Sequence, residues 1–212
     1  MKQLLLVGAG DWGREVYSWL SDAQGFGTEW SVKGFLDGNP AALTGRAACE
    51  HQVISAPHAY EPVADDVFVC AIANPIAKAK VVEQLLAKGA QFISLIHKSV
   101  IFYDEVTVGA GCILAPNVVI GCQAMIQDHV GINIGCSIGH NVEIGRCTQL
   151  SCQIDLTGYV KLGERVFVGS SACVIPNIRV GDQATVGAGS VVLQDVEAAT
   201  TVFGNPARVI KR

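Results

Sequence analysis

A large apolar residue recurs at every sixth position from residue 102 to residue 186, and this period constrains the fold more than any other feature. Glycine directly follows eight of these residues, at positions 109, 121, 139, 145, 163, 169, 181 and 187. The fifth position of each hexad is small or β-branched almost throughout. The fifteen apolar positions are Phe102, Val108, Leu114, Ile120, Ile126, Ile132, Ile138, Ile144, Leu150, Leu156, Leu162, Val168, Val174, Val180 and Val186.

A period of six differs from the helical repeat and from the period-two alternation, with irregular turns, of an ordinary β-sandwich. Each hexad instead suits one short flat strand and a tight corner. The first side chain points into a narrow core, and the fifth is kept small by the bend. We expect the glycines to relieve the corner backbone. Three hexads close one coil, so the fifteen hexads predict five coils of a parallel β-helix, stacked at about 4.8 Å.

The first ninety-odd residues follow a different pattern, in which short apolar runs alternate with segments of helical spacing. Strands are predicted at 3–7, 32–36, 67–72 and 91–93, and helices at 13–20 and from Pro75 to about Lys88. This βαβ order predicts a small parallel sheet. We therefore divide the chain into an α/β domain, residues 1–95, and a β-helix domain with a C-terminal cap, residues 96–212.

Gly8, Gly10 and Gly13 form a glycine-rich turn between the first predicted strand and the first helix. Such a turn admits phosphates, and the helix N-terminus directs its amides at them. Asp37 ends the next strand and could hydrogen-bond a ribose or a base. The pattern alone suggests NAD. The domain has only about half the strands of a dinucleotide site, so one nucleotide carrying a sugar fits better.

Composition excludes several classes of protein. Half of the residues are hydrophobic and 16% are charged, which argues against disorder. A net charge of -4 without a Lys/Arg cluster argues against nucleic acid. No apolar run is long enough to span a membrane, and the short run before Gly8 does not resemble a signal peptide. The eight cysteines lack a C-x-x-C pair, so we interpret them as buried thiols in a reducing cytoplasm.

Motifs along nearly the whole chain carry a family resemblance. They are Gly8-Ala9-Gly10-Asp11-Trp12-Gly13, Gly34-Phe35-Leu36-Asp37, Ala71-Ile72-Ala73-Asn74, Leu95-Ile96-His97-Lys98-Ser99, Ile132-Asn133, Ile138-Gly139-His140, Ile175-Pro176-Asn177, Val186-Gly187-Ala188-Gly189 and Gly204-Asn205-Pro206-Ala207. With them the chain resembles the bacterial nucleotide-amino-sugar N-acetyltransferases and the sister sialic acid O-acetyltransferases. These are left-handed β-helix, hexapeptide-repeat acyltransferases with an N-terminal nucleotide-sugar domain.

The resemblance implies an acetyl-CoA-dependent enzyme that needs no metal. Its acceptor would be a nucleotide-linked 4-amino-deoxy sugar used in surface glycan biosynthesis, such as that of O-antigen. It also implies a homotrimer with active sites at the subunit interfaces. By motif match, the nucleotide sugar would contact Gly8, Gly10, Asp11, Trp12, Gly13, Asp37 and Gly38.

A histidine is the expected general base, because a neutral imidazole suits removal of the acceptor's proton near neutral pH. His129 and His140 lie within the repeats, and the resemblance implies a catalytic role for His140 alone. It further implies that Asn133 orients the acetyl thioester. Asn141 stands where the family usually has Asp or Glu beside the base, so it can hydrogen-bond the imidazole but carries no charge.

Coenzyme A would lie along the outside of the β-helix. By motif match its contacts are Gly169, Ser170, Gly187 and Ala188, with residues 204–207 near the adenine, and Gln149 replaces a second histidine found in relatives. Three alternatives remain open. A carbonic anhydrase-like metal enzyme needs three histidines meeting across subunits, and the repeats supply two. A non-catalytic scaffold would follow if His140 is only structural. The nearest rival is an O-acetyltransferase acting on a sialic acid or another sugar hydroxyl.

Overall fold

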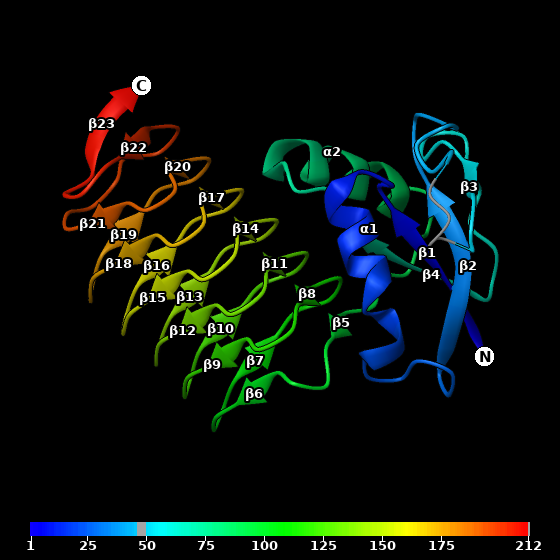
Figure 1. Cartoon of the computed structure of the whole chain (residues 1–212), viewed down its shortest axis with the longest axis horizontal. Coiled ribbons are helices and arrows are strands. Elements are labelled where there is room, and N and C mark those ends of the chain that lie inside the picture. The colour runs from blue at the N-terminus through cyan, green and yellow to red at the C-terminus, as the bar shows by residue number, and fades with distance from the viewer. Residues whose placement is uncertain (46–49, 212) are drawn as a thin grey trace.

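The computed structural model describes residues 1–45 and 50–211, and the chain begins with a four-stranded parallel sheet (Figure 1). The strand order is β3-β2-β1-β4, from β1 (Lys2–Val7), β2 (Trp30–Leu36), β3 (Val53–Ser55) and β4 (Asp66–Cys70). Alternate residues of β1 pack on opposite faces: Leu4 and Leu6 toward α1 (Asp11–Ser18), Leu5 and Val7 toward α2 (Pro75–Leu86). A short 3₁₀ helix, η1 (Leu20–Asp22), follows α1.

The predicted strand at 91–93 is wrong. The segment makes a single bridge, between Phe68 and Phe92, because the chain turns away at Ser94 to enter the β-helix. The fourth strand is β3 instead, at the other edge of the sheet. The helix predicted from Pro75 is confirmed: the side chain of Asn74 accepts a hydrogen bond from the Ala77 N–H, 2.9 Å long, and caps it.

The repeats form a parallel β-helix with three flat faces, and each strand pairs with the strand three hexads later. The first face contains β5 (Leu95–Ile96), β8 (Ile113–Leu114), β11 (Gly131–Ile132), β14 (Gln149–Leu150), β17 (Phe167–Val168), β20 (Thr185–Val186), β22 (Thr201–Phe203) and the antiparallel β23 (Arg208–Lys211). The second contains β6 (Ile101–Phe102), β9 (Val119–Ile120), β12 (Ser137–Ile138), β15 (Asp155–Leu156), β18 (Cys173–Val174) and β21 (Val191–Val192). The third contains β7 (Thr107–Val108), β10 (Met125–Ile126), β13 (Glu143–Ile144), β16 (Lys161–Leu162) and β19 (Arg179–Val180).

The corners correct one sequence interpretation. The glycines that follow the apolar positions do not adopt a positive φ; the fourth residue of each of the fifteen hexads does, and it is often Asn or Gln. Those glycines allow neighbouring coils to approach instead. A Cβ on Gly121 would lie 2.7 Å from the backbone nitrogen of His140, and a Cβ on Gly139 would lie 2.8 Å from the backbone nitrogen of Gly158. The short distance between stacked coils, rather than a positive φ, therefore explains why glycine occupies these positions.

The two domains share a core. The first residues of the hexads fill the inside of the β-helix from Leu114 to Val186. A second cluster joins Trp12 and Trp19 of the α/β domain to Ile113 and Ala115 on and beside the first face. In Figure 1 the α/β domain accordingly lies against the early coils, while β22 and β23 end the chain at the far end. The first β-helix strand begins at Leu95, next to the predicted domain boundary.

Candidate functional site

The glycine-rich turn joins β1 to α1, and its three glycines differ in their surroundings. Gly8 has a φ of +102°, and a Cβ there would lie 3.0 Å from the Ala71 carbonyl oxygen. A Cβ on Gly13 would overlap the Gly8 carbonyl oxygen. Gly10 has no neighbouring atom within 4 Å of such a Cβ. Gly8 and Gly13 are therefore required by the fold, whereas Gly10 borders open space.

Asp37 fixes this turn from the neighbouring strand. Its Oδ2 accepts a hydrogen bond from the Ala9 N–H at 2.7 Å, and its Oδ1 accepts one from the Asn39 N–H at 2.8 Å. A pocket of about 280 Å³ lies beside it, at the carboxyl ends of the strands, and its lining includes Gly8, Asp37 and Gly38. Open parallel sheets bind ligands at this end. The structure thus brings three of the residues predicted to bind the nucleotide to one pocket.

Of the four other predicted nucleotide-binding residues, Gly10 and Gly13 belong to the glycine-rich turn, whereas Asp11 and Trp12 lie away from the pocket. Asp11 is exposed and forms an ion pair with Arg14 within α1. The Trp12 side chain is 8% exposed and packs in the core shared by the two domains. In this structure the Trp12 ring supports the contact between domains.

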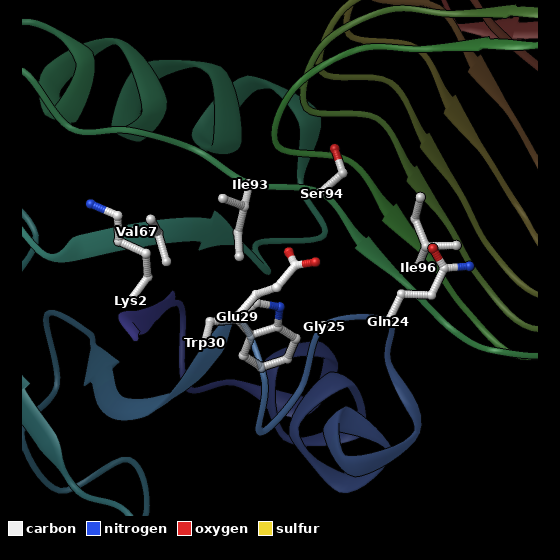
Figure 2. A pocket seen from close by; sticks show the side chains of 9 residues that line it. All are labelled: Lys2, Gln24, Gly25, Glu29, Trp30, Val67, Ile93, Ser94 and Ile96. Carbon is white, nitrogen blue, oxygen red and sulfur yellow. The ribbon is translucent and has the colours of Figure 1, made fainter.

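A second pocket, of about 230 Å³, lies between the α/β domain and the start of the β-helix. Figure 2 shows Glu29 and Trp30 on one side of it and Ser94 and Ile96 on the other. Because Lys2 and Trp30 begin β1 and β2, this pocket lies at the amino ends of the strands. It is at the opposite end of the sheet from the glycine turn, so it does not belong to the predicted nucleotide site.

His140 is exposed at the corner between the second and third faces, which we call the second edge. Its Nδ1 lies 3.1 Å from the Asn141 Oδ1. The Tyr159 ring packs edge-on against the imidazole, with centroids 5.1 Å apart. A Cβ on Gly158 would lie 2.6 Å from the His140 Nε2, so this glycine leaves room for the ring. With Nδ1 held by Asn141, Nε2 is the nitrogen left for a substrate.

The predicted coenzyme A residues gather at another corner, between the first and second faces, which we call the first edge. Asn133, Gly169 and Gly187 directly follow β11, β17 and β20, so they repeat along this edge at whole-coil intervals. Ser170 and Ala188 are exposed beside them. The turn at 204–207 follows β22 on the same edge. The Asn133 side chain is 9% exposed, and its Oδ1 accepts a 2.7 Å hydrogen bond from the Ile134 N–H.

Within one chain, therefore, the coenzyme A residues and His140 lie on different edges of the β-helix. The second face separates them. Asn133 is on the first edge and His140 on the second, so one chain does not place both at the same corner.

Gln149 is not on the surface. Its side chain is 3% exposed, and its Oε1 accepts a 2.8 Å hydrogen bond from the Nζ of Lys78. Lys78 reaches in from α2 and also donates to the carbonyl oxygens of His129 and Thr148, at 3.3 and 3.4 Å. Burial lowers the pKa of Lys78 to about 8. In this structure Gln149 joins the two domains.

Sequence reasoning missed Lys78. Its spacing from Val82 and Leu85, four and seven residues on, places it on the buried face of α2, and this was the available signal. His129, which the resemblance left without a catalytic role, is also buried. Burial lowers its pKa to about 4, and its ring packs against Phe92 at 4.7 Å.

No group of three His, Cys, Asp or Glu side chains in the described residues could hold a metal ion. The seven cysteines in this part of the chain are free, and four of them are buried; Cys49 lies outside it. Over the same residues, no helix is long and apolar enough to cross a bilayer.

Known proteins share both the sequence and the fold. The model of the hexapeptide repeat of succinyl-transferase matches residues 159–194. The GDP-perosamine N-acetyltransferase of Escherichia coli O157:H7 is 31% identical over 98% of this chain and 96% of its own length. A serine acetyltransferase of Synechococcus elongatus is 51% identical, over 24% of this chain and 21% of its own.

Two solved structures superpose over nearly the full chain. One is a variant perosamine N-acetyltransferase from Caulobacter crescentus in complex with CoA and GDP-perosamine, with a TM-score of 0.89 and 24% identity, covering 100% of this chain and 98% of that one. The other is the acetyltransferase domain of PglB from Neisseria gonorrhoeae in complex with acetyl coenzyme A, with a TM-score of 0.87 and 24% identity, covering 99% of each chain.

The fold is that of the left-handed β-helix acyltransferases with an N-terminal α/β domain, which confirms the predicted fold class. The full-length similarity to the Escherichia coli N-acetyltransferase identifies the protein as an acyltransferase. The chain belongs to the family of the nucleotide-amino-sugar N-acetyltransferases that includes the GDP-perosamine enzyme, as its motifs predicted.

Proposed function

We propose that this protein transfers the acetyl group of acetyl-CoA to the amino group of a nucleotide-linked 4-amino-deoxy sugar, in surface glycan biosynthesis. The observation that carries the chemistry is His140, an exposed histidine whose Nδ1 is held 3.1 Å from Asn141 Oδ1. Full-length similarity to a GDP-perosamine N-acetyltransferase supports the acceptor class. The pocket beside Gly8 and Asp37 supports a nucleotide in the α/β domain.

In the proposed reaction the sugar amine attacks the thioester carbon, and its proton passes to Nε2 of His140. The carbon–sulfur bond then breaks, and coenzyme A leaves as a thiol after taking a proton back from the imidazole. Backbone N–H groups would hold the oxyanion. Asp37, Gly8 and Gly10 would position the nucleotide. Gln149 and the Trp12 side chain do not enter this scheme, because both are buried between the domains.

The separation of His140 from the first edge supports a shared site. In a homotrimer, the first edge of one subunit would meet the second edge of its neighbour. Acetyl-CoA on Asn133, Gly169, Ser170, Gly187 and Ala188 of one chain would then face His140 of the other. The cyclic symmetry of such a trimer would repeat the same contact three times.

The test is acetyl-CoA consumption with a panel of GDP-, UDP- and dTDP-linked 4-amino sugars, followed by mass spectrometry of the product. An amide on the sugar of one nucleotide conjugate is expected. Turnover of free sialic acid, with no response to any nucleotide sugar, would favour O-acetylation instead. Thermal shift provides an independent test, since nucleotide-linked amino sugars should raise the Tm and free sialic acid should not.

A further inference from the structure

Three polar side chains stack along the second edge, one coil apart, and we call them the corner ladder: Glu105, Gln123 and Asn141. The Gln123 Nε2 donates to the Glu105 Oε2 at 2.7 Å. The Asn141 Nδ2 donates to the Gln123 Oε1 at 2.9 Å. The ladder ends at His140, whose Nδ1 is 3.1 Å from the Asn141 Oδ1. A continuous hydrogen-bonded chain therefore links a carboxylate to the imidazole.

The Glu105 carboxylate fixes which side chain donates and which accepts in each hydrogen bond of the corner ladder. An ionised Glu105 can only accept a hydrogen bond, so Gln123 must present its amide nitrogen to it. Gln123 then offers its oxygen to Asn141, which must donate through Nδ2. This leaves the Asn141 oxygen facing His140, where it requires a proton on Nδ1. The neutral imidazole consequently carries its lone pair on Nε2.

We propose that Glu105 and Gln123 are positioning residues that set the tautomer of His140 through Asn141. The inference rests on the proposed role of His140 as the base. Neither side chain reaches the imidazole itself, so each acts only through its neighbour. The ladder supplies from two coils away the carboxylate that relatives usually carry beside the base. The left-handed backbone at position 141, with φ at +57°, suits asparagine.

Replacing Glu105 by Gln tests the donor–acceptor order of the corner ladder with little change in side-chain shape. An amide at this position can donate as well as accept, so the reversed chain becomes possible, with Asn141 donating to Nδ1 and the proton on Nε2. We expect kcat to fall about 3- to 10-fold, because a charge-assisted hydrogen bond no longer fixes the chain. The KM of each substrate should stay unchanged. Glu143→Gln is the matched control: this exposed carboxylate pairs with Lys161 on the third face, and its loss should leave kcat unaltered.

The Glu105→Gln substitution is also tested in the Asn141→Asp variant, where a positioning effect and a purely structural effect on kcat give different results. In Asn141→Asp a carboxylate faces His140 Nδ1 directly and sets the tautomer alone. Gln123 must then donate to Asp at position 141, which turns its oxygen toward Glu105. In this background Glu105→Gln should leave kcat unchanged or raise it, so the two substitutions are coupled. Nitrogen-15 NMR of the labelled histidines gives a direct reading. The His140 Nε2 should be unprotonated in the wild type and partly protonated in Glu105→Gln.

Loss of kcat in the wild-type background, absence of loss beside Asn141→Asp, and the altered nitrogen spectrum together support the proposal. An equal loss in both backgrounds, or an unchanged spectrum in Glu105→Gln, would overturn it. His140→Ala, assayed in parallel, separates this from the parent proposal. If that variant keeps its rate, the assignment of the base has failed; if it loses its rate while Glu105→Gln does not, only the ladder has failed.

Discussion

Single residues at the corners of the β-helix hold most of the proposed chemistry, and their backbone explains why. The fourth residue of every hexad adopts a positive φ, and along the second edge this position holds the polar side chains of Glu105, Gln123 and Asn141. Asn141 is one of these residues, and His140 directly precedes it. A corner can thus present polar side chains while the apolar first position of each hexad remains in the core.

At Gly10, a bulky side chain should affect the acceptor and not the fold. A leucine at position 10 meets open space, whereas a ligand at the turn would lose its contact with the backbone. We expect Gly10→Leu to raise the KM of the nucleotide sugar and leave the KM of acetyl-CoA unchanged, with only a small decrease of Tm because Gly10 is the N-cap of α1. Gly13→Ala is the contrasting variant: its Cβ overlaps the Gly8 carbonyl oxygen, so it should lower the Tm. Equal loss of affinity for both substrates in Gly10→Leu would contradict this division of the site.

Asn141→Asp should change the pH dependence of the reaction. A carboxylate beside Nδ1 favours the protonated imidazole, so a higher pH is needed before His140 can accept a proton. The acidic limb of the kcat–pH profile should therefore move upward. Tyr159 packs against the imidazole, and the other titratable groups along this edge are Tyr103, Asp104, Glu105, Cys122 and Asp195. A profile that coincides with that of the wild type would show that Asn141 does not act on the base.

At the scale of elements, the repeat was predictable because its period is local. The residue that faces the core and the residue that fills the bend are six-residue features, visible without knowing what lies beside them. The contact between Lys78 and Gln149 was not visible, since it joins residues 71 positions apart. The same limit explains the error at 91–93, where the path of the next domain decides whether a strand forms. It also explains why the second-position glycines were misinterpreted: their neighbours belong to the next coil.

The buried contact between Lys78 of α2 and Gln149 predicts that the stability of the protein depends on pH. The pKa of Lys78 is about 8 in the folded chain and about 10.5 when exposed, so the unfolded chain binds the additional proton between these values. The contribution of Lys78 to the free energy of unfolding should accordingly rise with pH across this window, by about 3 kcal/mol, and be lowest below pH 8. Burial also raises the pKa of the Cys70 thiol to about 12 and those of Cys112 and Cys136 to about 11. These thiols lower the free energy of unfolding as the pH rises above 9.

The comparison with Lys78→Met removes the cysteine contribution. The stability difference between wild type and variant, from urea unfolding, should increase from pH 8 to pH 10. At neutral pH the variant should be less stable, because the buried Gln149 Oε1 loses its donor. Adding Gln149→Leu should recover part of that loss. A pH-independent difference would show that Lys78 is not buried in solution.

At the scale of the whole molecule, the second face is the expected surface for self-association. The outward residues of its six strands include one charged side chain: they are Ile101, Val119, Ser137, Asp155, Cys173 and Val191. The third face instead presents Glu143, Lys161 and Arg179. The second face also lies between the two edges that the proposed site must bring together across subunits.

Light scattering should therefore give three times the chain mass of 22.3 kDa. Val119→Glu, which places a charge in the centre of an apolar contact, should dissociate the assembly and abolish activity together. Lys161→Glu on the third face is the control and should remain trimeric. A stable, active monomer at micromolar concentration would contradict a shared site.

The role of His140 as general base is tested most directly by the turnover number of His140→Ala, measured with an acceptor verified for the wild type. Removal of a general base costs about 10²- to 10⁴-fold in rate, because the acceptor then reaches the thioester with its proton still bound. We expect kcat to fall by a factor of at least about 10², with substrate affinities and the trimer intact, since an exposed corner side chain contributes little to the core. A variant that keeps more than half of the wild-type rate would contradict this role, and the base would have to be sought elsewhere.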